Sequence, residues 1–579
     1  SYSKMKAFEL LSLLITITSC FPLLLSPIPR PYPSRKNPKL KMESEIISKK
    51  VCVIGAGWAG WGAAKALIKN NCEVILIDAL ADPTGSEPYL TPSGKPFEVG
   101  TRGFWKDYPN IENLVEELKL NANEIFTPFT ESSFYSPNGL EAKAPVFSSS
   151  NLPNLPSPLG QMFATFSNFK RLPLKDRLTL SGLLYAMLDL NRDEATFEAY
   201  DRMTAHELFI RIGMSKRLVN DFVRPTLLVG LFKNPEELSA AVAMELLYFY
   251  ALAHQDSFDV RWIKKMSIAE AIINPLSKNL QKSGQIEVLG GCRAEEIHIT
   301  GEDNEIEAVS YISKDGTKLK IENVDACVLA VGAKGLKQIM KASPELSKVC
   351  PQLTGAASLN GIDVISTRIW FDGFVETDTP ANVFSNFDEL RGAGGTFFML
   401  DQLQNNTELW GGSLPLGSVM AADFYNAGSL LPLSNKDLIN LLTVDLLPKA
   451  VPKFSSVKIV DSYVVRCPGA VSWFSPGSYA LRPPLEVSGV PNLVCAGDWV
   501  KMGDREHGSK GLCQERAFVS GLEAANALAR KGALGPDKMN EHEVIPIRKD
   551  EPQVVIGREV NRKVWEQLNF LGISSNWIR

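Results

Sequence analysis

Lys50-Val51-Cys52-Val53-Ile54-Gly55-Ala56-Gly57-Trp58-Ala59-Gly60 opens the part of the chain that decides its fold. The apolar run 50–54 predicts a buried strand that leads directly into a Gly-x-Gly-x-x-Gly turn. An alanine-rich stretch that favours helix follows to residue 69, and a second apolar run, 73–77, ends at Asp78. Strand, glycine turn, helix and strand in this order predict a Rossmann-like domain in an α/β protein.

The glycines and the acid have separate physical tasks in such a unit. Gly55 permits the tight turn, Gly57 lets the backbone approach a pyrophosphate, and Gly60 lets the helix pack closely on the strand. Amides at the start of the helix favour phosphate groups. Asp78 can accept a hydrogen bond from a ribose hydroxyl, which disfavours the 2′-phosphate of NADP. The predicted dinucleotide contacts are Gly55, Ala56, Gly57, Trp58, Ala59, Gly60 and Asp78.

Composition excludes several classes of protein. The 579 residues are 45% hydrophobic and 22% charged, which is typical of a globular chain and excludes a fibrous or wholly disordered one. A net charge of −4 lacks the basic footprint of a general nucleic-acid binder. Nine cysteines without a CxxC pair, and only five histidines, disfavour a zinc site and a dense disulfide framework. We therefore expect neither a metal nor a nucleic-acid partner.

Two further blocks indicate which dinucleotide is bound. The first, Phe-Glu-Val-Gly-Thr-Arg-Gly-Phe-Trp-Lys-Asp-Tyr-Pro-Asn at 97–110, precedes an amphipathic stretch that predicts a helix over 111–118. The second, at 492–499, predicts a strand that ends in Gly497-Asp498, and small residues near 517–525 predict the start of a helix. Asp498 can accept a hydrogen bond from a sugar-chain hydroxyl, and the helix amides can face a phosphate or an electron-rich ring.

These blocks resemble those of the FAD-dependent carotenoid desaturase and amine oxidase superfamily, and most of all the plant and cyanobacterial phytoene and zeta-carotene desaturases. The resemblance covers about residues 50–532 and implies bound FAD. It implies that Ala294 contacts the adenine through its backbone and that Ser520 with Gly521 begins the closing helix. The contacts that it adds to the glycine turn are Glu98, Gly100, Ala294, Gly497, Asp498, Ser520 and Gly521.

The sequence departs from that superfamily around the flavin ring. The family's Gly-Gly-Lys or Gly-Gly-Arg after the ribose acid is missing at 82–85, its histidine in the second block is Arg102, and its Glu-Gly-Ala reads Glu-Arg-Ala at 515–517. We therefore expect a divergent relative. Position near the flavin makes weak catalytic candidates of residues that could equally be loop salt bridges or packing residues: Arg102, His507, Glu515 and Arg516.

An inserted α+β substrate domain is predicted between the blocks. Apolar residues recur at helical spacing over 172–190 and 203–255, and residues 363–371 alternate as in a half-exposed strand. We predict an FAD-binding domain of residues 48–150, 265–340 and 485–535, and a substrate domain of residues 151–264 and 341–484. Residues 536–579 form a more polar tail with no assigned role.

The head of the chain is predicted to be a targeting segment, residues 1–47. An apolar stretch interrupted by prolines leads into a basic one at 30–41, and only one acid precedes residue 43. This composition favours a chloroplast transit segment, and a secretory signal is the alternative. A membrane anchor would need about 20 unbroken apolar residues, and the prolines disfavour it.

The resemblance implies a plastid desaturase or isomerase-like enzyme that transfers hydride to flavin from a carotenoid or another long apolar polyene, with a quinone or oxygen as electron acceptor. Phe163, Phe166 and Phe169 share one face of a predicted helix. Lys170 and Arg171 follow them, so this face could dip into a membrane surface and admit the substrate, or could pack on the core. An amine or protoporphyrinogen-type oxidase and a non-catalytic FAD-bound assembly factor remain alternatives.

Overall fold

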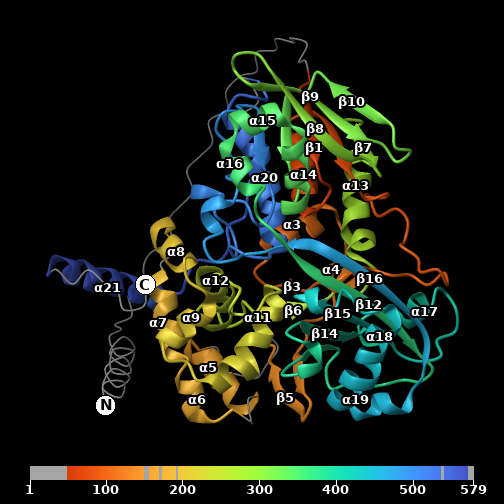
Figure 1. Ribbon diagram of the computed structural model, residues 1–579, viewed down its shortest axis with the longest axis vertical. Coiled ribbons are helices and arrows are strands. Elements are labelled where there is room, and N and C mark those ends of the chain that lie inside the picture. Colours follow the sequence, from red (N-terminus) through yellow and green to blue (C-terminus); the bar gives the residue numbers. More distant parts are fainter. Residues whose placement is uncertain (1–47, 149–154, 169–171, 191–192, 536–539, 572–579) are drawn as a thin grey trace, which may run out of the picture.

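The computed structural model describes residues 48–148, 155–168, 172–190, 193–535 and 540–571, which form two domains stacked in Figure 1. The upper domain is built on a sheet of five parallel strands, in the order β17-β11-β1-β2-β7. These strands are β1 (Lys50–Ile54), β2 (Glu73–Asp78), β7 (Ile286–Gly290), β11 (Ala326–Leu329) and β17 (Leu493–Cys495). Every residue of β11 and β17 is buried, as expected where helices cover both faces of a parallel sheet. The prediction of an α/β, Rossmann-like domain is confirmed.

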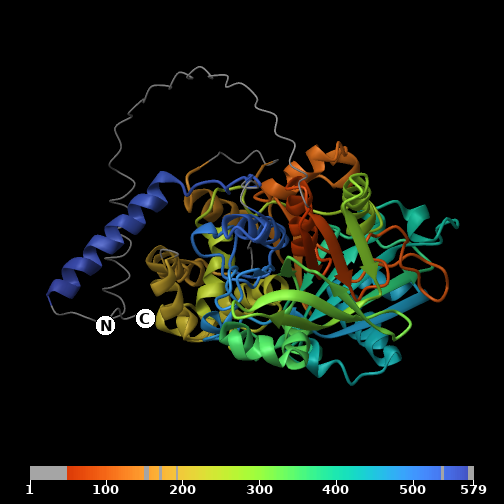
Figure 2. The same cartoon turned by 90° about the horizontal axis from the view of Figure 1, so that it is seen from above.

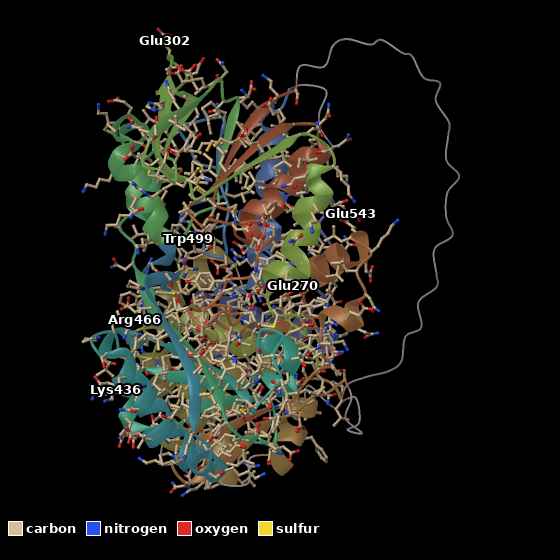
Figure 3. The ribbon with its side chains drawn as sticks, turned by 90° about the vertical axis from the view of Figure 1, so that its right-hand side faces the viewer. Glu270, Glu302, Lys436, Arg466, Trp499 and Glu543 are labelled. Atoms are coloured by element: carbon tan, nitrogen blue, oxygen red, sulfur yellow. The ribbon has the colours of Figure 1, made fainter. Side chains whose placement is uncertain are left out.

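Helices α2 (Trp58–Lys69) and α20 (Gln514–Arg530) pack on this sheet, and their backbones approach each other closely. An antiparallel sheet of β8 (Arg293–Thr300), β9 (Glu305–Ile312) and β10 (Lys318–Glu322) extends the domain. Its other helices are α3 (Pro109–Glu117), α4 (Ala122–Ile125), α13 (Asn274–Gln281), α14 (Ala333–Ala342), α15 (Pro344–Val349) and α16 (Pro351–Ala356). In Figure 3, Trp499 lies between Glu302, at the outer end of this domain, and Lys436 in the lower one.

The lower domain contains a seven-stranded mixed sheet in the order β16-β12-β15-β14-β13-β4-β5. Its strands are β4 (Ser132–Ser136), β5 (Gly139–Ala144), β12 (Gly361–Phe371), β13 (Ala381–Phe384), β14 (Gly394–Met399), β15 (Val419–Tyr425) and β16 (Ile459–Ser472). Strands β4 and β5 pair in this sheet, although the predicted boundary at residue 150 groups them with the other domain.

A cluster of helices around the nearly all-apolar α12 (Ala240–Ala251) completes the lower domain. The cluster contains α5 (Leu159–Asn168), α6 (Leu174–Leu178), α7 (Ser181–Leu190), α8 (Glu194–Asp201), α9 (Ala205–Arg211), α10 (Lys216–Leu218) and α11 (Arg224–Gly230). Short helices α17 (Asn406–Leu409), α18 (Asn435–Asn440) and α19 (Leu447–Ala450) accompany the sheet. A two-stranded ribbon of β3 (Phe104–Trp105) and β6 (Val260–Arg261) joins the second flavin block to this domain.

The prediction of a half-exposed strand at 363–371 is wrong. Ser366, Thr367 and Arg368 are all buried in β12. The alternation of polar and apolar residues predicted one solvent-exposed face, but β12 lies inside the sheet, between β16 and β15. The block at 97–102 covers its polar residues, and Gly100 binds Ser366.

The predicted targeting segment, 1–47, lies outside the described residues. Phe163 is 59% exposed, but the side chains of Phe166 and Phe169, together with Lys170 and Arg171, also lie outside them. Among the helices that are described, none is both long and apolar enough to cross a bilayer. The last helix, α21 (Pro552–Phe570), contacts α7 near its start and then extends away from the body of the molecule in Figure 2.

Candidate active site

The glycine turn after β1 has the shape that a pyrophosphate needs. Gly55 has a φ of +104°, and a Cβ built on it would lie 2.3 Å from the carbonyl oxygen of Ala330. A Cβ on Gly60 would lie 1.8 Å from the carbonyl oxygen of Gly55. Around Gly57, by contrast, no atom of the described residues lies within 4 Å of a built Cβ. The turn therefore leaves open space at the N-terminus of α2, where helix amides favour an anion.

The predicted ribose acid faces this turn. One carboxylate oxygen of Asp78 accepts a hydrogen bond from the amide of Ala56 and the other from the amide of Leu80, both at 2.6 Å. The backbone carbonyl of Asp78 accepts from the amide of Cys292 at 2.8 Å. Ala294, the predicted adenine contact, is two residues further along β8. The structure therefore places the predicted ribose and adenine contacts next to each other.

The second block is fastened to the substrate sheet by its backbone. The amide of Gly100 donates to the hydroxyl of Ser366 at 3.1 Å, and the amide of Thr101 donates to Asp423 Oδ2 at 3.0 Å. Gly100 has a φ of +78°, a conformation that favours glycine. Strands β12 and β15 of the lower domain thus position a flavin block of the upper one.

Four charged side chains surround this junction. Glu98 Oε1 lies 3.8 Å from Arg102 Nη1 and accepts a hydrogen bond from the amide of Ile268 at 3.0 Å. Burial raises the pKa of Glu98, while Arg102 and Arg368 oppose the rise. Burial also raises the pKa of Asp423 and lowers the pKa of Arg368 to about 10. The Arg102 side chain is 47% exposed, so it is accessible to solvent.

Arg368 and Asp423 are residues that the sequence reasoning missed. Arg368 is 3% exposed, and its Nε and Nη1 have no hydrogen-bond partner among the described residues. The guanidinium lies 5.3 Å from the centroid of the Phe97 ring and acts on Glu98 and Asp423 through its charge. An arginine directly before the apolar residues Ile369 and Trp370 of a predicted strand was the available signal, since an uncompensated buried charge is costly.

The third block joins β17 to α20. The amide of Gly497 donates to Ser520 Oγ at 2.7 Å. A Cβ on Gly521 would lie 1.9 Å from the carbonyl oxygen of Ala59, so α20 touches α2 at this point. These contacts give Ser520 and Gly521 a packing task, and their predicted contact with FAD stays a prediction.

Helix α20 begins at Gln514, earlier than the predicted start at Ser520 and Gly521. The side chain of Cys513 caps it by accepting a hydrogen bond from the amide of Arg516. The small residues near 517–525 predicted a later start. The first turn also forms because Gln514, Glu515 and Arg516 bind residues that are distant in the sequence.

Asp498 follows β17 as a half-buried carboxyl group. Burial raises its pKa to about 6, against the lowering effects of Arg516 and of the amide of Cys513. A carboxylate in such a place costs stability when it is charged, and a hydroxyl of a bound sugar chain would compensate part of that cost.

Asp498→Asn is therefore expected to stabilise the FAD-free protein at neutral and higher pH. The pKa of Asp498 in the folded state lies above the ordinary value of an aspartate, so the folded state binds this proton more tightly and loses that stability as pH rises through about 6. We expect a gain of about 1–2 kcal/mol, reduced by the partial exposure of the group. Urea unfolding of both apoproteins at about pH 5 and about pH 8 measures it. If the free energy of unfolding changes by the same amount between these two pH values in parent and variant, the raised pKa assigned to Asp498 is contradicted.

Glu515 closes the N-terminus of α3. It is completely buried and accepts hydrogen bonds from the amides of Asn110 and Ile111 at 2.9 and 3.0 Å, and from Asn110 Nδ2 at 2.7 Å. His507 Nε2 lies 3.0 Å from the same carboxylate. An anion is favoured at a helix N-terminus, so these contacts give Glu515 and His507 a structural task.

Arg516 holds the long loop before α20. Its guanidinium donates to the carbonyl oxygens of Asp498 and Val500 at 2.8 and 2.7 Å and to that of His507 at 3.1 Å. It also lies 2.5 Å from a carboxylate oxygen of Glu506. Catalytic roles for these residues stay predictions, and their contacts favour the structural alternative.

Comparisons with known proteins agree with this arrangement. The family described as "Flavin containing amine oxidoreductase" matches residues 60–529. The 15-cis-phytoene desaturase of Arabidopsis thaliana is 26% identical over 511 residues, which cover 85% of this chain and 82% of the relative. The zeta-carotene desaturase of Solanum lycopersicum is 23% identical over 537 residues, covering 88% and 84%. The solved structure of cyclohexylamine oxidase from Brevibacterium oxydans has the same fold, with a TM-score of 0.53, 15% identity and coverage of 83% and 100%.

Proposed function

This chain belongs to the family of flavin-containing amine oxidoreductases, and from that premise we propose that it desaturates a carotenoid or another long apolar polyene. FAD is the cofactor of the family, as predicted, and the chain is an FAD-dependent oxidoreductase. The observation that carries the proposal is the similarity to phytoene and zeta-carotene desaturases, which extends through both domains. The likeness to cyclohexylamine oxidase is one of fold alone, at 15% identity.

In this proposal each part of FAD has its own contact in the chain. Gly57 and the start of α2 receive the pyrophosphate, Asp78 the ribose and Asp498 the ribityl chain. Glu98 and Gly100 lie beside the ring. Bound there, FAD supplies the acceptor for a hydride from an allylic C–H group.

The surroundings of the second block favour an apolar substrate. Trp105 contacts Tyr108 and Phe258, with ring centroids 5.6 and 6.0 Å apart, and Phe258 stacks on Tyr250 at the end of α12. A polar amine does not need such a lining. Desaturation also releases a proton when the second C–H bond breaks. We propose that the carboxylate of Glu98 accepts this proton, because its raised pKa makes it a stronger base than an ordinary carboxylate.

Anaerobic reduction of the flavin tests the proposal. The holoprotein is mixed with phytoene or zeta-carotene in liposomes, with a primary amine, or with protoporphyrinogen, and the flavin absorbance is followed. Bleaching by a polyene alone supports the proposal, and Glu98→Gln should then keep FAD but slow the bleaching at least about tenfold. Bleaching by the amine or by protoporphyrinogen alone identifies an oxidase. No bleaching by any of them favours an FAD-bound assembly factor.

We also propose a plastid location and peripheral contact with a membrane, where a quinone can accept the electrons. The matched relatives carry the words "chloroplastic/chromoplastic" in their names. Apolar side chains are exposed on neighbouring helices of the lower domain. They are Leu159, Met162 and Phe163 of α5 and Leu174 and Leu178 of α6. Sedimentation of the protein with liposomes, or its failure to sediment, tests the membrane contact.

A further inference from the structure

Residues 540–551 run along the outside of the molecule from the upper domain to the lower one. The side-chain amide of Asn526 binds the backbone of His542 twice, accepting from its N–H at 2.7 Å and donating to its carbonyl at 3.0 Å. Asn110 binds the backbone of Ile545 in the same way, with both distances 2.8 Å. Two side chains of the upper domain therefore hold this segment as a neighbouring strand would.

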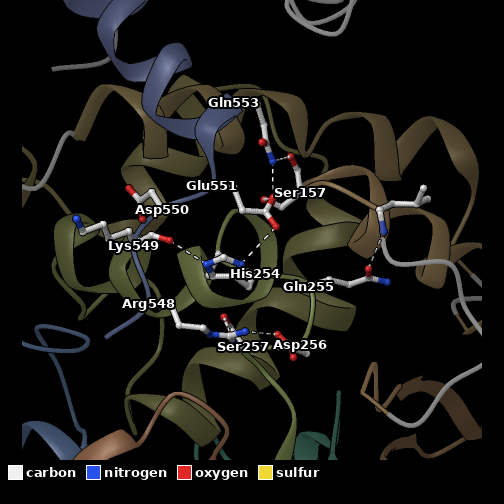
Figure 4. Close-up of polar contacts among 12 residues, drawn as sticks. Ser157, His254, Gln255, Asp256, Ser257, Arg548, Lys549, Asp550, Glu551 and Gln553 are labelled. Atoms are coloured by element: carbon white, nitrogen blue, oxygen red, sulfur yellow. Dashed lines mark hydrogen bonds and ion pairs between the residues drawn. The ribbon is translucent and has the colours of Figure 1, made fainter. Parts of the chain in front are cut away.

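Arg548 then connects the two domains through one guanidinium. Its Nε lies 2.6 Å from Asp107 Oδ1, beside the second flavin block. Its Nη1 lies 2.8 Å from Asp256 Oδ1, in the loop that follows α12 of the lower domain. Its Nη2 donates to Ser257 Oγ at 3.1 Å (Figure 4).

The next residues bind the lower domain. His254 Nε2 lies 2.8 Å from the carbonyl oxygen of Lys549, and His254 Nδ1 lies 3.4 Å from Glu551 Oε1. The other carboxylate oxygen of Glu551 accepts a hydrogen bond from the amide of Ser157 at 2.8 Å (Figure 4). Helix α21 starts directly after Glu551 and packs on α7, where a Cβ on Gly557 would lie 3.3 Å from Leu188.

The same segment leads back to the cofactor site. Asn110 donates to Glu515 as well as to Ile545, and Glu515 stands in the first turn of α20. Gln514, its neighbour, accepts a hydrogen bond at 3.0 Å from the indole of Trp58, the first residue of α2. A chain of hydrogen bonds therefore links the segment to the residue that follows the glycine turn.

We propose that residues 540–551 are an interdomain strap that slows the release of FAD. The strap joins the two domains that enclose the proposed FAD site, and it fixes Asn110 and so the first turn of α20. It lies beyond residues 60–529, the part of the chain that the family model matches. The inference rests on FAD being the cofactor.

A pair of matched double variants tests the strap in the full-length holoprotein. Arg548→Gln with Glu551→Gln removes the charged groups that bind Asp107, Asp256 and His254, and leaves the ion pairs of Glu541 and Asp550 in place. Arg562→Gln with Glu566→Gln removes an exposed ion pair within α21, whose side chains are 2.7 Å apart. After dilution, the rise in flavin fluorescence measures FAD release. We expect release at least about tenfold faster in the strap variant and unchanged in the control. High salt should speed release from the parent more than from the strap variant, because it screens partly exposed charges.

The outcomes separate the strap from the cofactor assignment. A parent that holds FAD, with equal release rates in both double variants, overturns the strap. A parent that cannot be reconstituted with FAD overturns the cofactor assignment and the strap with it. If the strap variant does not fold, Glu551→Gln alone is compared with Glu566→Gln, and equal release rates again overturn the inference.

Discussion

Gly60→Ala is expected to yield a protein that folds poorly and contains no FAD. The new Cβ would lie 1.8 Å from the carbonyl oxygen of Gly55, and α2 and the glycine turn fix the backbone on both sides of this contact. Overpacking costs about 1–3 kcal/mol and sometimes more, and a backbone contact this short belongs at the upper end. Urea unfolding and the FAD content after purification measure the two effects.

Gly57→Ala is the matched control for that experiment. No atom of the described residues lies within 4 Å of its built Cβ, so the apoprotein should be nearly as stable as the parent. Its methyl group would occupy the space left for the pyrophosphate, so FAD binding should weaken. A Gly60→Ala protein with the parent's stability and FAD content would show that α2 does not pack on the turn as described.

Glu515→Ala is expected to lower the free energy of unfolding by about 3–5 kcal/mol. The completely buried carboxylate accepts from two amides at the start of α3 and from Asn110 Nδ2, and alanine leaves both amides without this acceptor. Glu515→Gln keeps one carbonyl oxygen and should lose less. Thermal or urea unfolding gives the stability of each variant.

The rate of flavin reduction decides between a structural and a catalytic Glu515. If its task is structural, the holoprotein that remains should be reduced within a few-fold of the parent's rate. A variant with the parent's stability, but with flavin reduction slowed by orders of magnitude, would instead show that Glu515 takes part in the chemistry.

The nucleotide-binding half could be predicted because its signals are local. Gly55, Gly60 and Asp78 act on neighbours that the chain itself brings close, within one strand–turn–helix–strand unit. The α/β class followed from that unit, and FAD followed from the resemblance of this unit and two further short blocks to a known family. The start of α20 was placed too late because its first turn is held by Trp58, Asn110 and the loop at 498–507, which are not its sequence neighbours.

The sequence by itself determined the Rossmann-like domain, since backbone conformation and spacing suffice to specify a glycine turn, and FAD followed from the resemblance of three sequence blocks to a known family. Only the tertiary structure decided which side chains support the flavin block. Asp423 reaches the amide of Thr101, and Ile545 reaches Asn110, across hundreds of intervening residues. Such pairs form because packing of the two domains buries their polar groups together, and a buried polar group must find a partner wherever the fold supplies one. That requirement does not appear in the local pattern of either partner.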